Sequence, residues 1–419
     1  MKNIRSELTN SIIYIVSSAI TAAIPLLALP ILTSHLTPEE YGKIGMFQAF
    51  YLGSSALVSF SINIYCERKF FSNESVDYRV IISNALAFIL LMVFVLISVP
   101  RFIYIPILES INIPIIWYYY SILCLLSNIL FTVSLSLLSI NRCSILYALV
   151  SVFYAFFNIS TSIFLIVVYD MGDYGRVLGL SLTSFLFIVI FISILCGLKK
   201  INLNLISFNR QIEIFKFGLS LWPHAFGFFI LNFVDRIWVS KELGSDVAGF
   251  YILALQLAGV ILLVYTSVNK AYIPWAYSHL SSYDENSLLL VKKSILYAVI
   301  SSVAIALFVF FISPYLLSIF ISEKFNASSQ LFRWLMLGSF ASGIYVLMSS
   351  IVIYFNENKL LSKVTFVSVI SNFILLFLFI PTLGVNGAVI AFILTRTLQV
   401  VIVGMKIRLL FNNHSLGCK

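Results

Sequence analysis

The sequence predicts an all-α integral membrane protein in which twelve transmembrane helices form two six-helix bundles. Of its 419 residues, 61% are hydrophobic and only 10% are charged, whereas a soluble protein keeps about a quarter of its residues charged. The apolar residues form continuous runs that are long enough to cross a bilayer. Two short patterns from the first half of the chain also recur in the second half, which indicates an internal repeat.

Continuous apolar runs predict the individual helices. A membrane-spanning helix needs about 20 mainly apolar residues. A β-barrel would show alternating rather than continuous runs, and helices satisfy all backbone hydrogen bonds inside the bilayer. The predicted spans are residues 10–32, 42–65, 80–100, 114–140, 145–168, 176–198, 213–239, 247–272, 290–313, 331–355, 360–380 and 384–410.

The first span follows Lys2 and Arg5, as the apolar part of a signal peptide would. However, the apolar run is longer than that of a signal peptide, and no cleavage site of small residues follows it. We therefore expect the first span to be retained.

Lysine and arginine predict the orientation of the spans. The two ends and the even-numbered connections, including the basic segment from Lys199 to Lys216, hold most of these residues. The opposite side holds fewer, among them Arg101 and Arg176. Under the positive-inside rule both termini lie in the cytoplasm. This bias accounts for most of the net charge of +9, so we expect no nucleic-acid partner.

Several classes of chemistry lack their sequence motifs. The chain contains no GxxxxGK[ST] phosphate-binding loop, no HExxH zinc motif and no CxxC pair. Every connection between predicted spans is short, which leaves no room for a soluble catalytic domain. We expect the protein not to be an enzyme and to carry neither metal nor cofactor.

The internal repeat divides the chain into two halves of equal orientation. At one constant offset, Thr33 and Gly42 recur as Ser240 and Gly249. A second match, at a similar offset, aligns GDYG from Gly172 with GVNG from Gly384. Parallel repeats of this kind are one common plan of transporters, with the substrate site between the repeats. The predicted domains are 1–200, a cytoplasmic linker at 201–212, and 213–419.

Ionisable residues inside spans mark the candidate binding site, because such residues are costly in lipid and usually face a cavity or a partner. Arg396 and His224 lie near the middle of their spans, and Lys270 lies near the cytoplasmic end of the eighth. The candidate binding residues are Arg396, Arg236, Lys270, His224, Arg333 and Asp235.

Each candidate also has a structural interpretation that the sequence leaves open. Lys270 and Arg236 can extend to the membrane interface. Asp235 can neutralise Arg236, and His224 can be a neutral, hydrogen-bonded core residue. Arg396 can donate to backbone carbonyls of neighbouring helices. Apart from Asp235, no carboxylate lies deep in a span, which predicts a cavity for an anionic rather than a cationic ligand.

Three stretches resemble a known family. They are PILTSHLTPEEYGKIGMFQAF from Pro30, NFVDRIWVSKELGSDVAGFYILALQL from Asn232, and PTLGVNGAVIAFILTR from Pro381. In the second stretch an Asp-Arg pair precedes Gly249 and Tyr251. Together they are similar to the Wzx-type flippases of O-antigen and polysaccharide repeat units, which share a superfamily with the MATE multidrug exporters.

This resemblance implies a MATE-like, V-shaped pair of bundles in the bacterial inner membrane. It implies that the protein moves an undecaprenyl-pyrophosphate-linked oligosaccharide from the cytoplasmic to the periplasmic leaflet by alternating access through a cationic cavity. The implied partners are this lipid-linked oligosaccharide and membrane lipids, with a polysaccharide polymerase and glycosyltransferases as further candidates.

Two alternatives stay open beside the flippase. One is a MATE-like antiporter of small molecules or ions, against which the absence of an acidic residue from the first span argues. The other is a membrane polysaccharide polymerase or O-antigen ligase. That alternative needs a sizeable external loop, and the external connections of this chain are short.

Overall fold

The computed structural model describes residues 2–71, 77–98, 113–197, 202–281, 285–355 and 357–417, and these residues form helices and no strand. They include ten helices that are long and apolar enough to cross a membrane, or twelve spans when each of two bent helix pairs counts as one. Every predicted span coincides with one of these helices or bent pairs. The predicted all-α membrane fold is therefore confirmed, whereas the V-shaped arrangement of the bundles stays a prediction.

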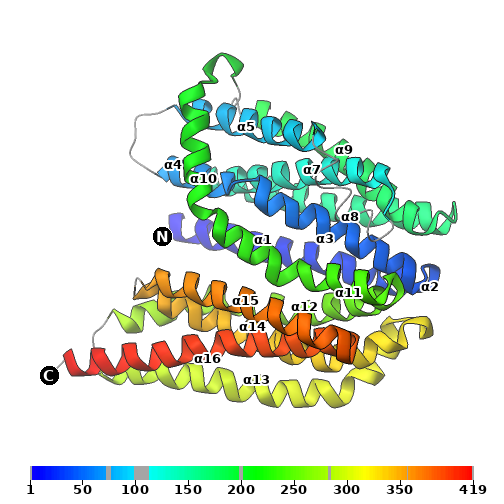
Figure 1. The fold of residues 1–419 in the computed structure, drawn as a ribbon. Coiled ribbons are helices and arrows are strands. Elements are labelled where there is room, and N and C mark those ends of the chain that lie inside the picture. The colour runs from blue at the N-terminus through cyan, green and yellow to red at the C-terminus, as the bar shows by residue number, and fades with distance from the viewer. Residues whose placement is uncertain are drawn as a thin grey trace. The chain divides into compact units, whose positions relative to one another are not determined.

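The chain divides into two compact units, Met1–Phe229 and Ile230–Lys419, and within each unit the long helices run side by side (Figure 1). Unit 1 contains α1 (Lys2–Leu27), α2 (Leu29–His35), α3 (Pro38–Val58), α4 (Ile62–Phe71), α5 (Tyr78–Ser98), α7 (Ile115–Ile140), α8 (Ser144–Val167), α9 (Gly172–Gly197), η3 (Leu203–Leu205) and α10 (Phe208–Phe229). Unit 2 contains η4 (Ile230–Val234), α11 (Asp235–Leu243), α12 (Ser245–Leu280), α13 (Glu285–Phe320), η5 (Glu323–Phe325), α14 (Asn326–Tyr354), α15 (Asn358–Leu383) and α16 (Val385–Gly417).

The division falls inside the seventh predicted span. Its first helix, α10, packs against α3, α4 and α5 of unit 1. The second part of the span, η4 and α11, belongs to unit 2. The predicted domain limits at 200 and 213 lie before this point and stay a prediction.

The two units repeat the same helix pairings. In unit 1, α7 packs against α3, α5 and α9, and α8 packs against α9. In unit 2, α14 packs in the same way against α12, α13 and α16, and α15 packs against α16. When the spans of each half are numbered in order, α3, α5, α7, α8 and α9 correspond to α12, α13, α14, α15 and α16. The same numbered spans are therefore in contact in both units, which supports the internal repeat.

The repeated glycines build equivalent turns before the last helix of each unit. Gly172 has φ +53° and Gly384 has φ +61°, a left-handed conformation that glycine adopts without steric cost. Gly387 then lets α16 approach the end of α15, since an added Cβ would lie 2.2 Å from the Phe379 carbonyl oxygen. This close approach fixes the start of the helix that carries Arg396.

The first span of each half is interrupted at an equivalent position. In unit 1, α1 ends at Leu27 and α2 begins at Leu29, with Pro30 in its first turn. In the second half, a π-helical segment, η4, precedes α11 at Asp235. The offset that aligns Thr33 with Ser240 also aligns the break at Ala28 with Asp235. The same predicted span also contains Pro223 inside α10, where proline removes a backbone donor.

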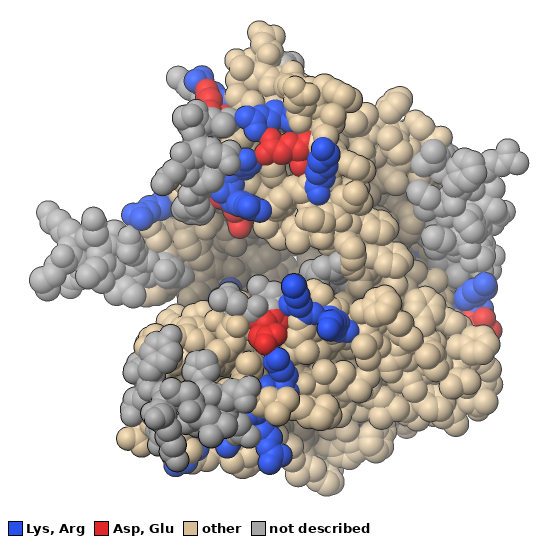
Figure 2. Space-filling model, turned by 60° about the vertical axis from the view of Figure 1, so that its left-hand side comes forward, with Lys and Arg blue, Asp and Glu red and all other residues tan. Residues whose placement is uncertain are grey.

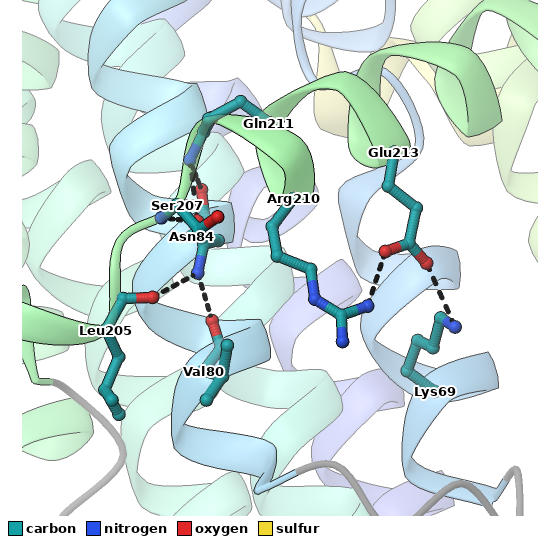
Figure 3. Close-up of polar contacts among 8 residues, drawn as sticks. All are labelled: Lys69, Val80, Asn84, Leu205, Ser207, Arg210, Gln211 and Glu213. Carbon is teal, nitrogen blue, oxygen red and sulfur yellow. Dashed lines mark hydrogen bonds and ion pairs between the residues drawn. The ribbon is translucent and has the colours of Figure 1, made fainter.

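The segment that precedes α10 is fixed to unit 1 by Asn84 of α5 (Figure 3). Asn84 is only 1% exposed. Its Nδ2 donates to the carbonyls of Val80 at 2.7 Å and Leu205 at 2.9 Å, and its Oδ1 accepts from the backbone N–H of Ser207 at 2.9 Å. Gln211 Nε2 of α10 donates to the same Oδ1 at 3.2 Å.

An ion pair adds a second attachment. Glu213 of α10 accepts from Lys69 of α4 at 3.0 Å and from Arg210 at 2.6 Å (Figure 3). The predicted cytoplasmic linker is therefore held against α4 and α5 over its described residues.

Charged side chains gather in a few groups on the face seen in Figure 2, and most of that face is uncharged. Several ion pairs involve residues near helix ends, such as Lys43 with Glu39 and Lys406 with Glu357, each at 2.8 Å. This distribution agrees with helices whose middle parts lie in lipid.

Candidate anion-binding cavity

Unit 2 contains a cavity of about 200 Å³ that three of the predicted binding residues line together. Its walls come from the π-helical segment and from α11, α12, α14 and α16. The lining residues are Leu231, Asn232, Asp235, Arg236, Leu255, Gly259, Leu262, Ser339, Ser342, Phe392 and Arg396.

Arg396 enters the cavity from α16 and binds the π-helical segment. Its Nη2 donates to the Leu231 carbonyl at 2.8 Å and to Asn232 Oδ1 at 3.1 Å. Its Cζ lies 5.2 Å from the centre of the Phe392 ring, within the range of a cation–π interaction. Both bonded acceptors are neutral, so the Arg396 charge is solvated by dipoles without being cancelled by them.

Asp235 supplies the carboxylate of the cavity, and the residue is only 5% exposed. Its Oδ2 accepts from the Tyr251 hydroxyl at 2.7 Å, and its Oδ1 accepts from the backbone N–H of Arg236 at 2.8 Å. Tyr251 is fully buried in α12, which holds the carboxylate in place. Asp235 therefore contributes negative charge to the wall through an anchored group.

Arg236 brings a second guanidinium to the cavity, and one of its donors is buried and unpaired among the described residues. Its Nε is buried and makes no hydrogen bond within the described part of the chain. Its Cζ lies 5.4 Å from the centre of the Phe233 ring. A buried donor that lacks an acceptor is costly, so an anionic ligand that accepts a hydrogen bond from this Nε would be stabilised.

The charges of the cavity wall do not cancel. Two guanidinium groups and one carboxylate line it, which leaves one positive charge in excess. Neutral polar groups of Asn232, Ser339 and Ser342 accompany them. Hydrogen bonds between a guanidinium and a phosphate are among the strongest in proteins, and a site of this composition suits a phosphate-type anion.

The other predicted site residues lie elsewhere. Lys270 is exposed on α12, and Arg333 of α14 has its Cζ 5.9 Å from the Phe310 ring; neither lines the cavity. The side chain of His224 lies outside the described residues.

The Ser339–Ser342 pair lines the cavity but was not among the predicted site residues. The sequence signal is the run of small residues GSFASG, Gly338 to Gly343, which places two hydroxyls on one face of a helix.

A second buried arginine was not predicted as a site residue, because Arg176 follows a connection and counts as a surface cation in the sequence. It is 7% exposed in α9. Its Nη1 donates to the Asn158 carbonyl and side chain, both at 3.1 Å, and to Ser162 Oγ at 2.6 Å. The sequence signal is the spacing of Asn158 and Ser162, which places both on one face of α8.

Metal-binding clusters of three or more His, Cys, Asp or Glu side chains are absent from the described residues.

Similar proteins share the fold over nearly the whole chain. An inward-facing multidrug resistance transporter of the MATE family, in the MOP superfamily, is 15% identical, with a TM-score of 0.76 over 96% of this chain and 98% of that one. The lipid II flippase MurJ in an inward closed conformation is 16% identical, with a TM-score of 0.75 over 98% of this chain and 90% of that one. At these identities the likeness establishes the fold.

Sequence comparison also identifies relatives. A protein of the Lsg locus of Haemophilus influenzae is 23% identical over 376 residues, which cover 86% of this chain and 88% of that protein. The family model described as "Polysaccharide biosynthesis protein" matches residues 8–279, more than half of the chain. The chain belongs to this polysaccharide biosynthesis family, as its resemblance to polysaccharide flippases indicated.

Proposed function

We propose that the protein is a flippase for an undecaprenyl-pyrophosphate-linked oligosaccharide such as an O-antigen unit. The observation that carries this proposal is the cavity that Arg236 and Arg396 line together. Within the described residues, the buried Nε of Arg236 has no hydrogen-bond acceptor. The pyrophosphate of the lipid would bind these two guanidinium groups. The family assignment supports a substrate from polysaccharide synthesis.

Transport proceeds by alternating access. The oligosaccharide and the pyrophosphate pass through the polar interior of the protein. The polyprenyl tail stays in the hydrocarbon of the bilayer throughout, so it is not transferred into water. The direction is from the cytoplasmic to the periplasmic leaflet of the bacterial inner membrane, with both termini in the cytoplasm. Interrupted helices at Ala28 and at the π-helical segment supply places where spans can bend.

An antiporter of cations is the second candidate, because Asp235 offers a buried carboxylate in the same cavity. Both of its oxygens already accept hydrogen bonds, from Tyr251 and from the Arg236 amide. The excess of guanidinium groups also repels a cationic substrate. The charge of the cavity therefore favours an anionic ligand.

A transport assay tests the flippase. The purified protein is placed in liposomes with an undecaprenyl-pyrophosphate-linked oligosaccharide, and the sugar that becomes accessible to an added glycosidase is measured. We expect Arg236→Gln and Arg396→Gln each to reduce the rate at least tenfold, since a charged hydrogen bond contributes about 1.5–3 kcal/mol and about 1.4 kcal/mol corresponds to tenfold.

Lys241→Gln is the matched control, because Lys241 lies on the same helix as Arg236 but is exposed and outside the cavity. It should transport at the wild-type rate. Normal transport by both arginine variants would refute the proposed site, and flux of small organic cations in place of the lipid would support the antiporter.

A further inference from the structure

The π-helical segment Ile230–Val234 lies where the backbone passes from one compact unit to the other. A π-helix is rare, usually spans a single turn, and is found frequently at functional sites. In this geometry the N–H of residue i+5 pairs with the carbonyl of residue i. The Leu231 carbonyl lies inside the segment, and the Arg236 N–H lies just after it.

Side chains of the cavity engage both members of that pair. Arg396 Nη2 donates to the Leu231 carbonyl at 2.8 Å. The Arg236 N–H donates to Asp235 Oδ1 at 2.8 Å. A carbonyl of the segment and an amide next to it are thus bound by two charged groups that also line the cavity.

We propose that Arg396 is a positioning residue that holds this segment in the π-helical form while the cavity is empty, and that an anion in the cavity releases it. The inference rests on the proposed function, since it assumes that an anion binds in this cavity and adds that its binding changes the winding of the segment. A phosphate oxygen competes for the Arg396 guanidinium, because its charge makes it a stronger acceptor than a neutral carbonyl.

Release has a defined structural consequence. Without Arg396, the Leu231 carbonyl is free to accept a regular α-helical bond from the residue four positions later. The segment then rewinds to α-helix, which turns α11 relative to the residues before Ile230 and changes the bend of the seventh span. Ligand binding is thereby linked to the bend at the point that joins the two halves.

Hydrogen–deuterium exchange of the purified full-length protein tests this without ligand. Arg396→Met keeps an aliphatic side chain against Phe392 but removes the donors to Leu231 and Asn232. The proposal predicts that amide exchange across residues 230–236 becomes severalfold slower in this variant, because the segment rewinds to α-helix. A merely structural contact predicts the opposite, since its loss would loosen the segment and speed exchange.

Two further arms separate this inference from the proposed function. Inorganic pyrophosphate should slow exchange in the same segment of the wild type. Arg396→Gln, whose shorter side chain does not reach the Leu231 carbonyl, should show the same slower exchange as Arg396→Met without ligand, and little response to pyrophosphate. Titration calorimetry measures pyrophosphate binding separately.

The outcomes are distinct. Faster or unchanged exchange in ligand-free Arg396→Met overturns the role of Arg396 in holding the segment, even if pyrophosphate binds. If Arg396→Met does not fold, the test is made on the wild type alone. Pyrophosphate that binds the wild type without changing amide exchange in residues 230–236 then overturns the inference. Failure of pyrophosphate to bind the wild type argues against the proposed function, whereas the ligand-free comparison still decides the role of Arg396.

Discussion

Arg396 illustrates how a single guanidinium can be tolerated deep in a membrane-spanning helix. The sequence left two interpretations open, a bond to helix carbonyls and a ligand-binding role. The structure shows the first, because Arg396 donates to the Leu231 carbonyl. It also places the same side chain on a cavity beside Arg236. The two interpretations are compatible, since an arginine held only by neutral acceptors keeps its charge available.

Asp235 provides a test at the same scale. Asp235→Asn keeps an acceptor oxygen for the Arg236 amide and presents an NH2 group to the Tyr251 hydroxyl, which can accept from it. The substitution removes the negative charge from the wall. We expect the affinity for inorganic pyrophosphate to rise severalfold and to fall more steeply with added salt, because screening acts on the larger net charge. Isothermal titration calorimetry at two ionic strengths measures both effects.

Tyr251→Phe is the companion variant, because it removes a neighbouring hydroxyl without changing the charge. It should leave the salt dependence unchanged. Unchanged or weaker binding in Asp235→Asn would contradict the electrostatic account of the cavity. If Asp235→Asn binds pyrophosphate but loses all transport, the result would instead support a role for the carboxylate in coupling ligand binding to transport.

At the scale of elements, Asn84 determines where the chain between the two halves is fixed. Its amide bonds the Leu205 carbonyl, the Ser207 N–H and Gln211 of the following helix (Figure 3). Since the segment before α10 is attached to α5, it does not act as a free tether over its described residues. Bending is then concentrated further along, at Pro223 and at the π-helical segment.

Asn84→Leu should release this segment. The substitution leaves the Leu205 carbonyl and the Ser207 N–H without their side-chain partner, and each unsatisfied buried group costs about 1–3 kcal/mol. We expect limited trypsin digestion to cut at Arg210 severalfold faster than in the wild type, as read by mass spectrometry. Asn204→Leu is the control, because Asn204 is exposed in the same segment and should not change the cutting rate. Equal rates for both variants would show that the attachment does not depend on Asn84.

At the scale of the whole molecule, the sequence was sufficient for the spans and the repeat. Twenty or so continuous apolar residues leave few alternatives in a bilayer, so the helices lie where the runs lie. The aligned glycines, Gly172 and Gly384, both adopt positive φ. Glycine adopts this conformation without steric cost because it lacks a Cβ, so the sequence itself marks these two turns. The pairing of helices follows the same order in both units.

Other features depend on contacts that no local pattern contains. The π-helical segment is bound by Arg396, which lies 165 residues from Leu231 in the chain. Arg176 resembles a surface cation in sequence, but its burial results from Asn158 and Ser162 on a neighbouring helix. Lys270 has the sequence position of a site residue and yet is exposed, because the rotation of a helix about its axis is set by packing.

Binding of undecaprenyl pyrophosphate to the purified protein, compared with binding of undecaprenol, tests the central claim most directly. The two lipids share the same tail and differ in the pyrophosphate. We predict at least tenfold tighter binding of the pyrophosphate lipid, since one charged hydrogen bond contributes about 1.5–3 kcal/mol, and loss of this preference in both Arg236→Gln and Arg396→Gln. Equal affinity for the two lipids, or a preference that survives both substitutions, would contradict the account.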